Sequence, residues 1–153
     1  MAGSNIRCGE FEGEDKSGSP ALAVLAGAYC RVFNRKPRGR IALALAALTR
    51  SKRSGVEALA ESALLSVKYD EIGKIPADVC SCLLADLKNY QKEVLDRLGV
   101  PDDVEEIFPK MAKTREAKYG WTHDDGWHAY CLHDLVPAFE KSARTRKPVE
   151  IVW

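Results

Sequence analysis

The sequence predicts an α+β protein that is mainly α: a compact bundle of about five or six helices with a small C-terminal β-hairpin or strand element. Three observations support this prediction. Apolar residues recur at helical spacing through most of residues 19–111, several of these segments carry capping signals, and the closing KPVEIVW has strand composition. A chain of 153 residues can bury one hydrophobic core but is too short for two, so one domain is expected.

Two helices are predicted in the first third of the chain. The first runs from Pro20 to Asn34, with Ser19 as its N-cap and the proline at a position where a missing N–H does no harm. The second runs from Arg40 to Arg50. Its central run, IALALAAL, alternates as a strand would, but the four alanines in it favour a helix.

A third helix is expected to begin at Ser54, because Ser54 and Glu57 fit the capping-box pattern. Gly73 and Pro76 are expected to end it. The apolar face of this helix comprises Val56, Leu59, Ala60, Ala63 and Val67.

The clearest helical pattern extends from Pro76 to Leu98, and Gly99 follows as a C-terminal glycine. We expect this helix to form the spine of the bundle. A short helix should follow, with a capping box at Asp102 and Glu105, and Pro109 should kink or shorten it. The apolar stripe of the long helix comprises Cys80, Leu83, Leu84, Leu87, Val94 and Leu98.

Residues 119–153 are predicted to form a hairpin, a helix and a strand in turn. Aromatic flanks surround an Asp-Asp-Gly turn, and residues 127–132 alternate as in a strand. The helix would then run from Asp134 to Arg144, with Pro137 in its first turn.

Two points in this region remain open. The closing strand is expected to pair either with the hairpin or with residues 5–12. The alternative to the hairpin is a single helix from Gly126 to Arg144, kinked at Pro137.

The expected organisation is one domain, residues 19–153, after a partly extended N-terminal segment, residues 1–18. The longest uncharged run has 14 residues, fewer than the roughly 20 that a membrane-spanning helix needs. The N-terminal residues are acidic and lack the basic start and apolar centre of a secretion signal. We therefore expect a cytoplasmic protein without a membrane partner, with its five cysteines as free thiols.

Basic and acidic residues occupy different parts of the chain. Residues 16–56 contain nine basic residues and no acidic one, whereas residues 57–107, the acidic segment, contain twelve acidic and five basic residues. Arginine and lysine at this density favour contacts with phosphates or carboxylates. The alternative is that the basic residues neutralise the acidic helices within the fold.

The favoured interpretation is a binding or regulatory protein without enzymatic activity or cofactor. Its basic segment, residues 31–53, is expected to engage nucleic acid or an acidic protein, and a homo-oligomer is a further expected assembly because the two segments are complementary in charge. The residues expected to contact the partner are Arg31, Arg35, Lys36, Arg38, Arg40, Arg50, Lys52 and Arg53.

A histidine cluster suggests a second function. The three histidines lie five residues apart, between His123 and His133, so neither a helix nor a strand would point all three at one ion. A hairpin turn would bring His123 and His128 together, with Asp124 or Asp125 as a third ligand. Such a site would suit zinc or another divalent transition metal in a small metal-dependent hydrolase.

Other catalytic signatures are absent from the sequence. It contains no G-x-S-x-G nucleophile elbow, no H-E-x-x-H zinc motif and no glycine-rich phosphate loop. The binding interpretation is therefore placed first and the metal-dependent enzyme second.

Overall fold

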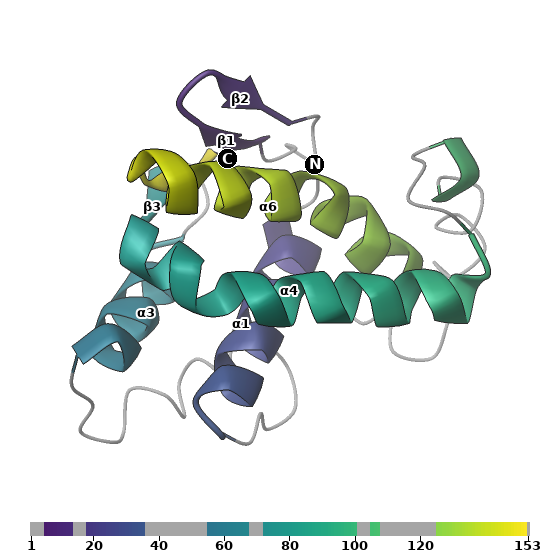
Figure 1. The fold of residues 1–153 in the computed structure, drawn as a ribbon, viewed down its shortest axis with the longest axis horizontal. Helices are drawn as coiled ribbons and strands as arrows, with labels where there is room; N and C mark the ends of the chain where they lie inside the picture. The colour runs from purple at the N-terminus through teal and green to yellow at the C-terminus, as the bar shows by residue number, and fades with distance from the viewer. Residues whose placement is uncertain are drawn as a thin grey trace.

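The computed structural model describes residues 5–13, 18–35, 55–67, 72–100, 105–107 and 125–152. Within these residues it contains four helices of eleven residues or more and one four-stranded antiparallel sheet (Figure 1). This architecture confirms the prediction of a mainly helical fold with a small β element. No helix in this part of the chain is long and apolar enough to cross a membrane.

The sheet joins strands from both ends of the chain. Its order is β2-β1-β4-β3, so the C-terminal strand lies between the N-terminal hairpin and a strand from the middle of the chain. Of the two partners predicted for the closing strand, residues 5–12 are the one found. The strands are β1 (Asn5–Cys8), β2 (Phe11–Glu12), β3 (Ile72–Ile75) and β4 (Val149–Val152).

The sheet has one buried face and one face toward solvent, as the alternating burial along each strand shows. On the outer face the register aligns Glu12 with Arg7, Arg7 with Glu150, and Glu150 with Lys74. This row of alternating charge crosses all four strands, and Arg7 and Glu150 form an ion pair at 3.6 Å. Because a shift of one residue would break every pair and expose the apolar face, the row favours this register.

Strand β3 lies where the sequence predicted the end of a helix. Helix α3 (Gly55–Leu65) stops earlier than expected, and Val67 folds back so that the strand lies against it. A Cβ atom at Gly73 would lie 2.7 Å from Cγ2 and 2.9 Å from Cα of Val67. The glycine that was expected to end a helix therefore permits close approach of two backbone segments.

Two of the predicted helices are confirmed almost to the residue. Helix α1 (Gly18–Val32) matches the helix predicted for residues 20–34, and α4 (Ala77–Leu98) matches the one predicted for residues 76–98. Pro76 precedes α4, and Gly99 ends it in the left-handed conformation, at φ 67°. The helix predicted for residues 40–50 lies outside the described residues, as do the flanks of the short helical segment at 105–107.

Helix α6 (Asp125–Thr145) shows that the hairpin predicted for residues 119–133 is wrong from Asp125 onward; residues 119–124 lie outside the described part of the chain. The alternative, one helix through Pro137, is the arrangement found. Twelve of its residues are buried, on nearly every side of the helix, so the sequence lacks the polar face that identifies a helix by its period. α6 has more buried residues than α4.

Helices α4 and α6 run side by side in opposite directions (Figure 1). Three ion pairs at their exposed edges follow this antiparallel register. They join Asp78 to Arg146, Lys88 to Glu140 at 2.7 Å, and Arg97 to Asp125 at 2.9 Å.

Two apolar clusters lie along this helix pair. The larger is formed by the inner face of the sheet with α1, α3 and parts of α4 and α6. The smaller contains Val94, Ile107, Ala129 and Tyr130. Tyr90 packs against both clusters, so it marks the boundary between them.

All five cysteines are free, as predicted. Cys8, Cys30, Cys80 and Cys131 are buried, and Cys82 is partly exposed. Burial raises the pKa of the Cys80 thiol to about 11, although a hydrogen bond with Ser142 acts in the opposite direction. Burial also raises the pKa of Cys30 and Cys82.

Replacing Gly73 by Ala should destabilise the protein by about 1–3 kcal/mol, because the new methyl group meets backbone that cannot move aside. The matched control is Gly27→Ala in α1, where the nearest atom is the flexible tip of Arg31, at 3.1 Å, and alanine favours the helix. Urea unfolding measures both. Equal stability of the two variants would contradict the close approach at Gly73.

Brief treatment of the folded protein with iodoacetamide at pH 8 should modify Cys82 first, because Cys82 alone among the five is partly exposed. Cys80 should react slowly, because its thiol has a pKa of about 11 and is therefore ionised in only a small fraction of molecules at pH 8. Peptide mass spectrometry measures the sites. In guanidinium chloride all five should react alike, and a native Cys80 that reacts as fast as Cys82 would contradict its burial.

Candidate functional site

The end of α1 carries the two predicted partner-binding residues that the structure describes, Arg31 and Arg35. Asn34 has a left-handed conformation, at φ 53°, and the amide of Arg35 donates to the carbonyl of Cys30 at 2.7 Å, which ends the helix. The remaining predicted residues lie outside the described part of the chain: Lys36, Arg38, Arg40, Arg50, Lys52 and Arg53.

Arg31 is held by α4. Its Nε donates to both carboxylate oxygens of Asp86, each at 3.0 Å, and its Nη2 donates to Oδ1 at 2.7 Å. The guanidinium carbon also lies 4.5 Å from the centre of the Tyr90 ring, which is within range for a cation–π contact. The guanidinium is thus fixed in orientation while 43% of the side chain stays exposed.

Arg35 is held by α3. Its Nε donates to Oε1 of Glu57 at 2.8 Å, and the Tyr29 hydroxyl donates to the same oxygen at 3.2 Å. The hydrogen bond with Glu57 raises the pKa of Arg35 above its ordinary value. Glu57 was expected to complete a capping box with Ser54, which lies outside the described residues; in the structure its carboxylate also connects α3 to α1.

Both pairs connect the basic segment to the acidic segment. Arg31 and Arg35 come from residues 31–53, and Asp86 and Glu57 come from residues 57–107. For these two arginines, internal neutralisation therefore accounts for part of the charge division in the sequence. Because both pairs are partly exposed, each contributes little to stability and mainly sets the position of its guanidinium.

A third arginine, Arg97, completes the arrangement around Tyr90. Its Nε and Nη2 each donate to one oxygen of Asp125 at 2.9 Å, a two-point contact between α4 and α6. Its guanidinium carbon lies 5.9 Å from the centre of the Tyr90 ring. The hydrogen bond with Asp125 raises the pKa of Arg97. Sequence reasoning missed Arg97, Tyr90 and Asp86. All three lie on α4 at helical spacing, but their partners Arg31 and Asp125 come from α1 and α6, which are distant in the sequence.

Tyr90 itself bonds to α6. Its hydroxyl lies 2.6 Å from Nδ1 of His128, which is only 7% exposed. With the proton on Nε2 of the imidazole, Nδ1 accepts the hydrogen bond from the phenol. Burial raises the pKa of Tyr90, the Asp125 carboxylate raises it further, and Arg97 and Arg31 lower it.

The predicted metal ligands are not brought together by the described residues. His123 and Asp124 lie outside them, His128 bonds to Tyr90, and Asp125 bonds to Arg97. Among the residues that are described, no group of three histidine, cysteine or acidic side chains could hold a metal ion. The zinc site and the hydrolase activity stay predictions. The hairpin on which they were based is replaced by helix α6 from Asp125 onward.

Comparison of the chain with family models, with curated proteins and with solved structures gives no significant match.

Replacing Tyr90 by Phe should destabilise the protein by about 1–3 kcal/mol, because the buried Nδ1 of His128 loses its hydrogen-bond partner. The difference from the native protein should depend on pH. The folded pKa of Tyr90 is above 10.0, so the unfolded chain releases this proton first, and stability is lost as pH rises above about 10. Urea unfolding at pH 7 to 11 should show the difference shrinking at the alkaline end. A difference independent of pH would contradict this assignment.

Proposed function

We propose that the protein is a non-enzymatic binding protein whose basic segment, residues 31–53, engages a polyanionic partner, either nucleic acid or an acidic protein surface. The observation that carries the proposal is the basic charge concentrated in this segment. Arg31 and Arg35 are paired within the fold, whereas residues 36–53 hold six basic residues and no acidic one. Clustered guanidinium and ammonium groups of this kind favour phosphate or carboxylate partners.

Several acidic residues of the described chain already bind arginines. Glu57 is engaged by Arg35, Asp86 by Arg31 and Asp78 by Arg146. A partner supplies negative charge that these acids no longer offer. The free thiols suit a reducing compartment, so we place this function in the cytoplasm.

Nucleic acid and acidic protein differ in their response to salt. Binding to a nucleic acid releases condensed counterions, so the logarithm of the affinity falls linearly with the logarithm of salt concentration, by about 0.9 per phosphate contact on duplex DNA. Fluorescence anisotropy with labelled DNA, RNA and a poly-glutamate peptide separates the two partner classes. A homo-oligomer, with the basic segment of one copy against the acidic segment of another, would instead appear as concentration-dependent sedimentation that high salt abolishes.

Replacing Arg38 and Arg40 by Gln should weaken binding of the preferred probe and, for nucleic acid, lower the salt slope by about two units. The matched control is Lys74→Gln with Lys92→Gln, which removes the same charge from exposed positions on β3 and α4. Anisotropy over a salt series measures both variants. An equal loss of affinity in the two double variants would show that only net charge matters, and would overturn the role of the basic segment. The absence of binding to every probe at low salt would overturn it too.

A further inference from the structure

We infer that Arg31 and Arg97, which flank Tyr90, form a second contact site, one that binds phosphate groups in the backbone of a nucleic acid. The inference rests on the proposed function and selects nucleic acid from its two partner classes. The site combines Arg31 of α1, which belongs to the basic segment, with Arg97 of α4, which lies outside that segment.

The first support is the convergence of the two guanidinium groups. Arg31 reaches Tyr90 from α1, and Arg97 reaches it from a position two turns further along α4. Their guanidinium carbons lie 4.5 and 5.9 Å from the same ring centre, so they cannot be farther apart than these two distances together. Within this limit, two successive phosphates of one strand can contact the two groups.

The second support is that both groups are oriented in advance and retain donors. Asp86 and Asp125 occupy Nε and Nη2 of the two arginines, so Nη1 of each lies outside these two ion pairs. The side chains are 43% and 49% exposed. A guanidinium that is already held in place loses little conformational entropy when it binds, and its planar donors match the geometry of phosphate oxygens.

The third support is the position of Arg31 in the chain. Arg31 lies one helical turn before Arg35, after which the other six basic residues of the basic segment follow in the sequence. A strand that contacts the basic segment where it leaves α1 would meet Arg31 first and Arg97 next. The two carboxylates offset the formal charge of the pair, so this site works through directed hydrogen bonds more than through net charge.

The test compares two variants that break the same ion pair with opposite changes in charge. Arg97→Gln should weaken binding of a labelled single-stranded RNA by about ten-fold at fixed salt and lower the salt slope by about one unit. Asp125→Asn also removes the ion pair but leaves the arginine, so it should bind the RNA at least as tightly as the native protein. Thermal unfolding should show a similar, small loss of stability in both.

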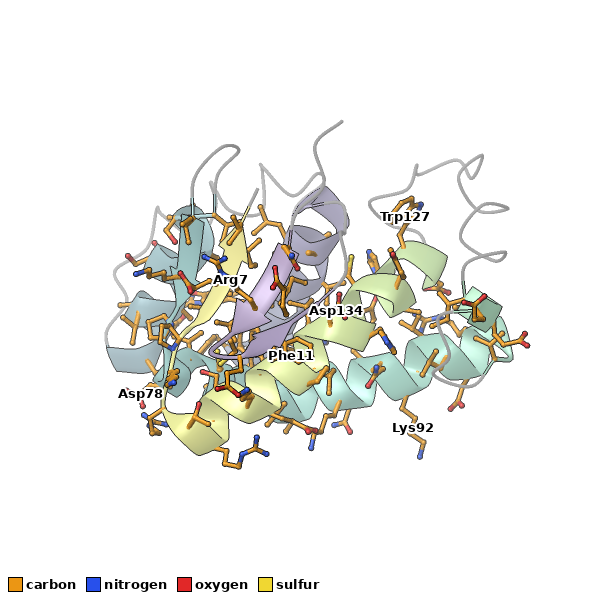
Figure 2. All side chains as sticks on the ribbon, turned by 90° about the horizontal axis from the view of Figure 1, so that it is seen from above. Arg7, Phe11, Asp78, Lys92, Trp127 and Asp134 are labelled. Carbon is orange, nitrogen blue, oxygen red and sulfur yellow. The ribbon has the colours of Figure 1, made fainter. Side chains whose placement is uncertain are left out.

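A charge-matched control is available on the same helix. Figure 2 shows Lys92 projecting from α4 away from α6 and the sheet, and this residue is exposed. Lys92→Gln removes one positive charge, as Arg97→Gln does, but at a distance from Tyr90. It should change binding far less than Arg97→Gln.

The possible outcomes separate this inference from the proposed function. If Arg38→Gln with Arg40→Gln weakens binding and Arg97→Gln does not, the basic segment stands and the second site is wrong. Equal losses in Arg97→Gln and Asp125→Asn would show that the ion pair acts only through the fold, and would overturn the inference. Stabilisation of the native protein by pyrophosphate without RNA binding would overturn the nucleic-acid assignment, and a preference for poly-glutamate over RNA would do the same.

Discussion

The packing of α6 on nearly all its sides is the constraint on which the rest of the structure depends. In a helix surrounded by α1, α4 and the sheet, a buried polar group without a partner is costly, and two of its buried polar side chains bond to neighbouring segments. His128 bonds to Tyr90 of α4, and the Ser142 hydroxyl donates to the carbonyl of Lys147. Asp134 lies against Gly13, at the end of the N-terminal hairpin, where any side chain would overlap it (Figure 2). The hairpin and α4 are thereby positioned by α6.

Ion pairs between partly exposed side chains then favour the observed alignment of the helices and strands. Ion pairs follow the antiparallel edges of α4 and α6, and a row of alternating charge follows the outer face of the sheet. Pairs of this kind are partly exposed and contribute little free energy each, but they disfavour other registers. At Arg31 and Arg35, residues of the basic segment thus form ion pairs with residues of the acidic segment. The other six basic residues of the segment lie outside the described residues.

The site around Tyr90 combines these two influences. The ring lies between the two apolar clusters, its hydroxyl is bonded to the buried helix, and its ring is approached by arginines from α1 and α4. A phenol whose pKa is raised by burial keeps its proton at neutral pH and so acts here as a fixed hydrogen-bond partner. The arrangement fixes two guanidinium groups whose side chains are 43% and 49% exposed.

The sequence by itself determined the elements whose signals are local. Pro20 lies in the first turn of α1, and Pro76 and Gly99 lie at the two ends of α4, which also carries a one-sided apolar stripe. The closing strand has β-branched composition. Each of these elements could therefore be predicted from neighbouring residues. Only the tertiary structure decided the remainder. Burial on nearly all sides removed the helical period of α6, a backbone contact with Val67 made Gly73 part of a strand, and contacts between α1 and α4 brought Arg31 to Tyr90 and Arg97. Contacts such as that between Arg31 and Tyr90 join positions far apart in the sequence, and they leave no periodic trace in the chain that encodes them.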